Sequence, residues 1–289
     1  MGVSGLPADA LTTAADRVAA AASAASRVAA DREYARSEPV VLQRTNNVVV
    51  WLRPHAIVAK VGTRAHSHER LAREHTLASV LAEAGAPVAV PAVAPVRDAQ
   101  SGLVVTLWHQ LEHDPGADVA PTDVASSLGR LHEGLVRYRG ELPSFRLALA
   151  RARAALADDR VSDTLTRDEI ALLHQTFERG GGALDARATN ERPLHGEPHR
   201  ANLLVTPAGL RWIDLEDACR GPLEWDLAFL PDEAAGMFAG ADPELLTLLR
   251  TLNSARVATW CALRPEYDEL RWHREHHLER VRANRALCL

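Results

Sequence analysis

Several side chains of types that do acid–base or metal chemistry crowd one short segment of the chain. They lie within LHGEPHRANLLV, where Gly196 and Pro198 favour a tight loop ahead of an apolar run that predicts a strand. Asp214 follows in WIDLED, at the end of the next expected strand. The loop residues concerned are His195, Glu197, His199 and Asn202.

The order of these groups is typical of phosphoryl transfer. The acidic residue Glu197 is followed five residues later by the amide Asn202 and, after twelve more residues, by the carboxylate Asp214. In kinase-type sites the first group orients the attacking hydroxyl, while the amide and the second carboxylate hold magnesium. Mg²⁺ prefers hard oxygen ligands and usually takes only one or two from protein, which Asn202 and Asp214 would supply.

Two other interpretations of this loop stay open. His195, Glu197 and His199 could ligate a transition metal if the segment were a strand, because alternate residues of a strand share a face. Gly196 and Pro198 argue for a loop instead, and no third histidine of a zinc pattern follows. The histidines could also be purely structural, with backbone groups as their hydrogen-bond partners.

Lys60 is the one lysine among the 33 lysine and arginine residues of the chain. It falls on the third of three β-branched runs, where a kinase-type lobe presents a lysine to the α- and β-phosphates of a nucleotide. On the helix expected next, Glu74 lies three residues from both Leu71 and Leu77 and shares their apolar face. An unpaired charge buried there would cost several kcal/mol, so we expect Glu74 to pair with Lys60.

The first 108 residues predict a small, mostly antiparallel sheet that forms an N-terminal lobe. An alanine-rich amphipathic helix is expected over residues 8–30, and a second helix over 67–84 before the stop signals Gly85 and Pro87. Short apolar, mostly β-branched runs predict five strands, at residues 39–44, 48–53, 56–61, 89–96 and 102–108.

Beyond the sheet, residues 109–120 form a polar stretch that predicts a hinge or linker. Residues 121–289 predict a mainly helical C-terminal lobe that contains a catalytic loop at 193–202 and a metal-binding segment at 211–217. The triplet Gly180–Gly182 predicts a loop after the helices of residues 145–179. The expected fold class is therefore α+β, with a small β-rich lobe and a larger helical lobe.

Composition argues against several classes of protein. A formal net charge of −5 and a pI near 6.2 disfavour a general nucleic-acid binder. Cys219, Cys261 and Cys288 are scattered, so neither a disulfide framework nor a thiolate zinc site is expected. No run reaches the ~18 apolar residues of a membrane span, and P-loop, Rossmann and α/β-hydrolase motifs are missing. We expect a soluble cytoplasmic protein whose partners are neither nucleic acid nor membrane.

Taken in order, these residues resemble the aminoglycoside phosphotransferase (APH)-like family of small-molecule kinases, which is distantly similar to protein kinases. The resemblance spans about residues 40–230 and includes Lys60, Glu74 and the segments AGAPVAVP, LGRLHE, HGEPHRANLL, IDLED and GPLEWDLA. It implies a protein-kinase-like bilobal fold, ATP or GTP as phosphoryl donor, and Mg²⁺. It also implies that the nucleotide base binds at the hinge, near Trp108, His109, Gln110 and Leu111.

The resemblance also implies a role for each residue of the loop. Glu197 stands where the family usually has an aspartate that acts as base, and Asn202 and Asp214 match the magnesium ligands. His195 and His199 are similar to the loop histidines of the family, which points to structural or positioning roles.

Asp226, in WDLA, resembles the structural acid that braces the catalytic segment in the family.

Two departures from the family pattern stand out. Glu197 is one methylene longer than aspartate, yet it can serve because phosphoryl transfer relies on positioning and electrostatics; the alternative is a non-catalytic homologue that only binds nucleotide. The loop RTNN contains no glycine, so phosphate contacts there would come from Thr45, Asn46 or Asn47.

The acceptor is less sharply defined than the donor. A polycationic aminoglycoside would need an acidic cleft, but residues 231–289 hold nine acidic residues against eight arginines and three histidines. The resemblance implies transfer of the γ-phosphate to a hydroxyl of a small molecule. That molecule would be an antibiotic, aminoglycoside or otherwise hydroxylated or nucleoside-like, with resistance as the result, or a primary metabolite such as a sugar or an amino alcohol. A monomer or a homodimer is expected.

Overall fold

The computed structural model describes residues 14–44, 47–63, 67–187 and 190–284, so the expectations for Thr45, Asn46 and Cys288 lie outside the described residues. The chain divides into two compact units. The first comprises residues 1–119, 129–138 and 201–217, and the second comprises residues 120–128, 139–200 and 218–289.

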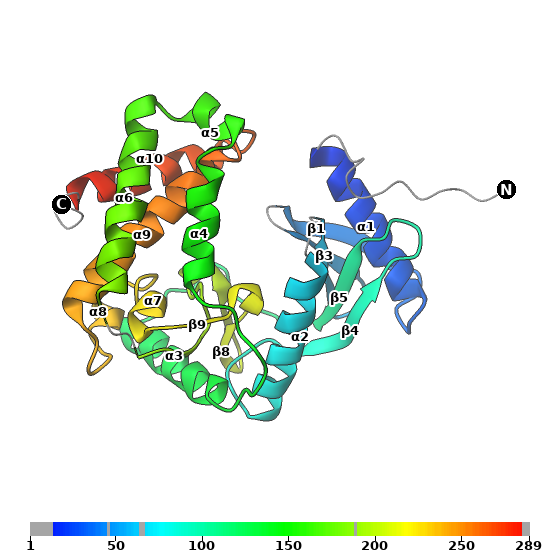
Figure 1. The fold of residues 1–289 in the computed structure, drawn as a ribbon. Helices are drawn as coiled ribbons and strands as arrows, with labels where there is room; N and C mark the ends of the chain where they lie inside the picture. Colours follow the sequence, from blue (N-terminus) through cyan, green and yellow to red (C-terminus); the bar gives the residue numbers. More distant parts are fainter. Residues whose placement is uncertain (1–13, 45–46, 64–66, 188–189, 285–289) are drawn as a thin grey trace. The chain divides into compact units, whose positions relative to one another are not determined.

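The first unit contains a five-stranded antiparallel sheet with strand order β1-β2-β3-β5-β4 (Figure 1). Helix α1 (Ala14–Ala30) packs against it through small alanine side chains. Helix α2 (Ser67–Glu83) follows the third strand and also contacts the sheet. The five predicted strands are present, as β1 (Glu38–Arg44), β2 (Asn47–Arg53), β3 (Ile57–Gly62), β4 (Pro91–Arg97) and β5 (Val104–His109).

The side chains of β3 alternate between the two faces of the sheet, and this alternation determines the face on which Lys60 lies. Ile57, Ala59 and Val61 enter the apolar core that α1 shares with the sheet. Because successive side chains of a strand point to opposite faces, Lys60 lies on the other face. Both faces of β3 are therefore occupied, which explains why five of its six residues are buried.

The first unit also contains a β-hairpin, which leads to Asp214. It is formed by β7 (Leu203–Thr206) and β8 (Gly209–Trp212), which pair antiparallel around a tight turn with Gly209 at a φ of 96°. The backbone of Trp212 donates to Pro87 O at 2.7 Å and accepts from Ala89 N at 3.0 Å. These bonds fix the hairpin against the segment that follows α2.

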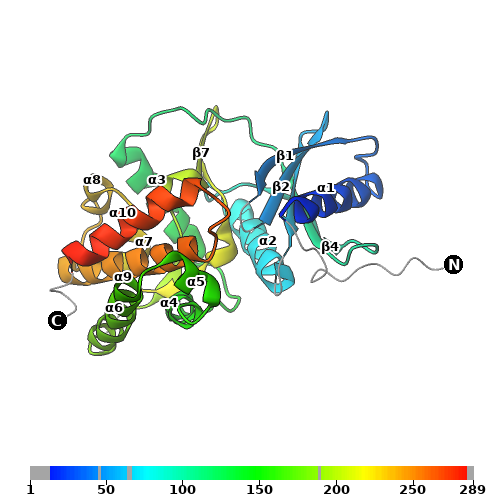
Figure 2. The same ribbon diagram turned by 90° about the horizontal axis from the view of Figure 1, so that it is seen from above.

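The second unit is mainly helical and is built around α9 (Pro243–Ala262), whose twelve buried residues run along most of its length. Against α9 pack α4 (Arg146–Ala155), α6 (Arg167–Asp185) and α10 (Glu269–Ala283) (Figures 1 and 2). Shorter elements are α5 (Asp159–Thr164), α7 (Leu223–Leu227), α8 (Asp232–Ala235) and the paired strands β6 (Arg192–Leu194) and β9 (Cys219–Gly221). Helix α3 (Pro121–Leu135) contributes residues to both units.

The glycine triplet is the expectation that the structure overturns. Residues 180–182 do not form a loop but lie inside α6, which begins at a capping box made by Thr166 and Glu169. A Cβ atom on Gly180 would lie only 2.7 Å from Leu252 Cδ2 of α9. Glycine is therefore used there for close packing of two helices, and this tertiary contact outweighs its low helix propensity.

Cys219 and Cys261 are buried thiols, and burial raises the pKa of the Cys261 thiol to about 11. Among the helices of the described ranges, none combines the length and the apolar character that crossing a membrane requires.

Candidate active site

In the first unit Lys60 lies among three carboxylates. Its Nζ atom is 2.7 Å from Glu74 Oε2, 2.6 Å from Asp214 Oδ1 and 3.5 Å from Glu216 Oε2. Lys60 is 8% exposed and Glu74, on the sheet-facing side of α2, is 2% exposed. The ion pair between Lys60 and Glu74 that their spacing predicts is present.

The charges of this cluster do not balance locally. Burial opposes the charge on Lys60, but Asp214, Glu216 and Glu74 outweigh it and hold the pKa of the ammonium well above its usual value. Burial raises the pKa of Glu74 to about 7, with Lys60 acting in the opposite direction. Lys60 and Arg70 pair with four carboxylates, those of Glu74, Asp214, Glu216 and Asp217, so the acidic groups outnumber the cations that pair with them. Glu74, Asp214 and Glu216 each have an oxygen within 4.8 Å of the others.

Asp214 stands beside the segment that carries Asn202. Ile213 N donates to Asn202 O at 3.0 Å, so the strand end and the start of the hairpin are joined by a main-chain hydrogen bond. Asp214 has a φ of 64°, a left-handed conformation that costs a non-glycine residue about 1–3 kcal/mol. Asn202 is buried, whereas the Asp214 side chain is 32% exposed. The main chains of Asn202 and of the residue before Asp214 are thus joined at the base of the hairpin.

Glu216 is a residue of this cluster that the sequence interpretation missed. Its carboxylate, 3% exposed, accepts from Asn47 Nδ2 at 2.8 Å and from Arg70 Nη2 at 3.2 Å. Arg70 also binds Asp217 at 2.7 Å, and Arg73 donates to Glu216 O at 3.0 Å. The signal available in the sequence was weak: an acidic pair two residues after Asp214 and two arginines one turn apart on the expected helix.

In the second unit, the loop that carries Glu197 is braced from inside. Asp226 Oδ2 accepts from His195 N at 2.9 Å and Asp226 Oδ1 accepts from Gly196 N at 2.8 Å. Trp225 Nε1 donates to Gly196 O at 3.0 Å. Asp226 and His195 are fully buried, and Gly196 has a φ of 90° that suits glycine. Asp226 therefore makes the bracing contacts that the family resemblance implies.

The two loop histidines are held by local contacts. Glu197 N donates to His195 Nδ1 at 3.3 Å, and His199 N donates to Glu197 O at 2.8 Å, which closes a tight turn rather than a strand. Within the described ranges, the side chains that gather as possible metal ligands are Glu74, Asp214 and Glu216, and not the His195, Glu197 and His199 group. The geometry thus gives no support to a transition-metal site on this loop.

Glu197 makes an ion pair that the sequence did not suggest. Arg256 Nη2, on α9, lies 2.7 Å from Glu197 Oε1. The two residues are 59 positions apart, so no local pattern could have linked them.

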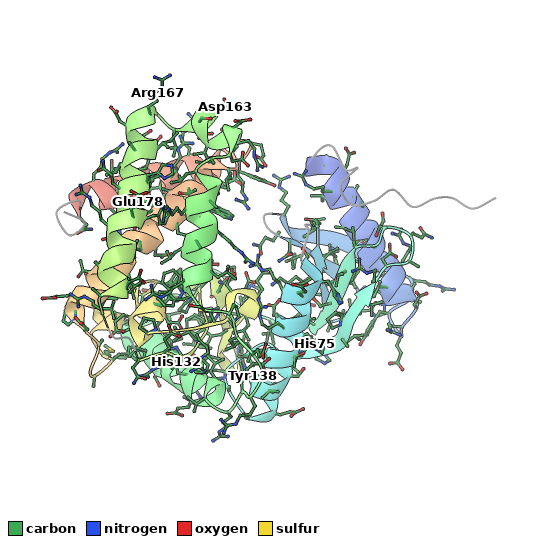
Figure 3. All side chains as sticks on the ribbon, in the orientation of Figure 1. His75, His132, Tyr138, Asp163, Arg167 and Glu178 are labelled. Carbon is green, nitrogen blue, oxygen red and sulfur yellow. The ribbon has the colours of Figure 1, made fainter. Side chains whose placement is uncertain are left out.

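The expected nucleotide-base residues lie at and just beyond the end of β5. Trp108 Nε1 donates to Thr106 Oγ1 at 2.9 Å, and its ring meets His75 of α2 edge-on at 6.4 Å (Figure 3 labels His75). His109 N donates to Val90 O at 3.2 Å, and Gln110 N donates to Ala56 O at 3.0 Å. Leu111 O is 2.9 Å from His113 Nδ1. The stretch is thus an ordered continuation of the sheet edge.

The profile of the phosphotransferase enzyme family, APH, matches residues 38–273. No curated protein matches the chain in sequence. Among solved structures, the amicoumacin kinase hAmiN in complex with AMP-PNP, Ca²⁺ and Ami has a TM-score of 0.61 at 12% identity, covering 85% of this chain and 88% of that one.

Two more solved structures share the fold at similar distance. The GDP and kanamycin complex of APH(2")-IIIa has a TM-score of 0.65 at 17% identity, covering 86% of this chain and 93% of that chain. A choline/ethanolamine kinase family protein from Mesorhizobium loti has a TM-score of 0.58 at 15% identity, covering 94% of each chain. The α+β, protein-kinase-like fold class is therefore confirmed, and the chain belongs to the phosphotransferase enzyme (APH) family.

Proposed function

We propose that the protein is a Mg²⁺-dependent small-molecule kinase that transfers the γ-phosphate of ATP or GTP to a hydroxyl group. The observation that supports this most strongly is the buried contact of Lys60 with both Glu74 and Asp214, in a chain of this family. Lys60 would bind the α- and β-phosphates of the donor, and Glu74 would hold its ammonium in place.

The residues present fit a magnesium ion. Asn202 and Asp214 offer an amide and a carboxylate oxygen, which are hard ligands, and the surrounding carboxylates outnumber the cationic side chains that pair with them. When bound, Mg²⁺ supplies positive charge that neutralises the phosphate oxygens during transfer. Asn202 and Asp214 would hold it, with Lys60 then engaged by the nucleotide.

Glu197 would take up the proton of the acceptor. The acceptor oxygen forms a new bond to the γ-phosphorus while the bond between that phosphorus and the β–γ bridging oxygen breaks, so ADP or GDP leaves. The hydroxyl proton passes to the Glu197 carboxylate. Asp226 holds the backbone of His195 and Gly196, and so the loop that presents Glu197, in one conformation. His195 and His199 would shape the turn. Trp108, His109, Gln110 and Leu111 would bind the nucleotide base.

For the acceptor we propose a hydroxylated antibiotic whose phosphorylation gives resistance, in a cytoplasm that supplies nucleotide and Mg²⁺. Structural neighbours named as kinases of amicoumacin and of aminopropanol, and one in complex with kanamycin, mark the range of acceptors on this fold. The near-equal numbers of acidic and basic residues in the last 59 positions favour a compound less cationic than an aminoglycoside. A primary metabolite such as a sugar or amino alcohol is the second candidate.

A panel assay of nucleoside diphosphate release tests this function. Purified protein with Mg²⁺ and ATP or GTP is incubated with aminoglycosides, nucleoside and other hydroxylated antibiotics, sugars and amino alcohols. We expect acceptor-dependent release of ADP or GDP that falls by about 10²–10⁴-fold in Glu197→Gln and is kept in Glu133→Gln, a matched change at an exposed position of α3. Nucleotide binding without turnover on any acceptor would indicate the non-catalytic alternative that the glutamate at position 197 raises.

A further inference from the structure

The carboxylate of Glu197 is held by a guanidinium from another element of its own unit. Arg256 Nη2 lies 2.7 Å from Glu197 Oε1, and the two side chains are 16% and 23% exposed. Partial burial makes such a pair stronger than a pair in open solvent, because water screens it less. The contact joins the Glu197 loop to the middle of α9.

Arg256 is itself fixed on three sides. Its Nε donates at 2.9 Å to Oδ1 of Asn253, one turn earlier on α9. Its guanidinium carbon lies 5.9 Å from the ring centre of Trp225 and 5.5 Å from that of Phe229, within the range of cation–π contact. A planar group bounded by an amide and two aromatic rings has few positions left to it, so it can act as a rigid anchor for a partner.

A glutamate at this position needs such an anchor more than an aspartate would. The extra methylene of Glu197 adds one rotatable bond between the braced backbone and the carboxylate. Asp226 fixes the backbone of His195 and Gly196 but does not by that contact fix the end of the Glu197 side chain. A proton acceptor has to be held in place relative to the reacting hydroxyl, because misplacement by ~1 Å can cost about a hundredfold in rate.

We propose that Arg256 is a positioning residue for Glu197, which holds the longer carboxylate where it can accept the acceptor proton. This inference rests on the proposed function of Glu197. Arg256 acts through Glu197 and stays bound to Asn253, Trp225 and Phe229 throughout. The replacement of aspartate by glutamate and the arginine on α9 are then two parts of one arrangement.

The test is a double-mutant cycle on turnover, with the acceptor that gives the highest rate in the panel assay. The variants are Arg256→Gln, Glu197→Gln and the double variant, with Arg256→Lys as a partial rescue. The control is Arg250→Gln, two turns earlier on α9, where the arginine binds Asp232 and Leu230 O instead. kcat and the KM for nucleotide are measured for each, together with the melting temperature.

We expect Arg256→Gln to lower kcat at least tenfold, with the KM for nucleotide changed less than twofold. Arg256→Lys should recover part of the loss, Arg250→Gln should keep the wild-type kcat, and the double variant should be no slower than Glu197→Gln alone. Full kcat in Arg256→Gln, or losses that multiply in the double variant, would overturn the inference.

Asn253→Ala is a second variant that keeps the test possible if Arg256→Gln does not fold at the assay temperature. If Arg256→Gln melts below the assay temperature, Asn253→Ala removes only the partner of Arg256 Nε; we then expect a fall in kcat of about threefold, and an unchanged kcat would overturn the proposal. Absence of turnover in the wild type on every acceptor would instead contradict the proposed function itself. The two failures are therefore distinguishable.

Discussion

At the scale of single residues, the site of Lys60 requires an ammonium group and not a guanidinium. Arginine fills the other 32 basic positions, but the Lys60 site brings two carboxylate oxygens within 2.7 Å of one nitrogen atom in a place that is 8% exposed. A guanidinium is wider and planar and presents its donors in a fixed fork. It cannot reproduce these contacts without displacing α2 or the Asp214 segment.

Lys60→Arg is therefore expected to lower kcat/KM for nucleotide by about a hundredfold or more although the charge is kept. Steady-state release of ADP or GDP measures this, and the melting temperature shows whether the variant folds. Arg97→Lys, at an exposed position at the end of β4, is the reverse change and should leave turnover unaltered. Near-normal turnover in Lys60→Arg would show that the retained lysine has no special role.

Asp226 gives a second prediction at this scale, on stability. Asp226→Ala leaves the backbone N–H groups of His195 and Gly196 buried without their acceptor. Each such loss costs about 1–3 kcal/mol, so we expect the free energy of unfolding to fall by about 2–6 kcal/mol. Urea unfolding measures it. Asp232→Ala, whose side chain is 84% exposed, should change it by less than about 1 kcal/mol.

At the scale of secondary-structure elements, α6 carries three glycines that act differently. Gly180 packs against Leu252, whereas a Cβ atom on Gly181 or Gly182 would have nothing within 4 Å. Alanine at either open position should stabilise the protein by about 0.5–1 kcal/mol, because alanine has the higher helix propensity. Gly180→Ala should instead destabilise it by about 1–3 kcal/mol through overpacking.

Chemical denaturation of the three single variants tests this argument. Equal stabilisation by all three substitutions would mean that Leu252 moves aside without cost, and that the glycine at position 180 is not required by the packing of α6 on α9.

An ion pair attaches α1 to the sheet, and it should make the free energy of unfolding depend on pH. Arg27 of α1 donates through Nε and Nη2 to the two carboxylate oxygens of Asp98, at 2.9 and 2.7 Å. These hydrogen bonds, with further ones from Ser101, lower the pKa of Asp98 to about 2. The folded state thus favours the ionised form of Asp98 over the protonated form. The contribution of this carboxylate to the free energy of unfolding is fully present above pH ~3.9, the pKa of aspartate in an unfolded chain, and is lost as the pH falls through the folded-state pKa.

We expect wild type to be more stable than Asp98→Asn by about 1–2 kcal/mol at pH 7. The difference should shrink as the pH falls from about 4 to about 2, where the carboxylate becomes protonated in the folded state as well. Unfolding free energies of both proteins across this range provide the measurement. A difference independent of pH would show that the ion pair with Arg27 does not support α1.

At the scale of the whole molecule, the proposed donor and metal should stabilise the fold together. A ligand at a hundred times its Kd adds about 2.7 kcal/mol to the free energy of unfolding. We expect ATP or GTP with Mg²⁺ to raise the melting temperature, EDTA to remove most of the rise, and Asp214→Asn to weaken it. A rise that is the same with and without EDTA would contradict the assignment of Asn202 and Asp214 as metal ligands.

The fold tolerates extensive change of sequence. Solved structures that share it are 11–17% identical to this chain. Since one fold supports several acceptors, substrate identity has to be argued from the site and its charges rather than from the architecture.

The sequence by itself determined the five strands, the helix after the third strand, and the order Lys60, Glu74, Glu197, Asn202, Asp214. These follow from local patterns, because strand and helix periods repeat within a few residues and Lys60 is only 14 positions from Glu74. The tertiary structure alone decided that Gly180 sits inside a helix, that Glu216 meets Asn47 across 169 positions and that Arg256 holds Glu197. Contacts between segments so far apart in the chain leave no periodic trace in the sequence, since they exist only when packing brings the two segments together.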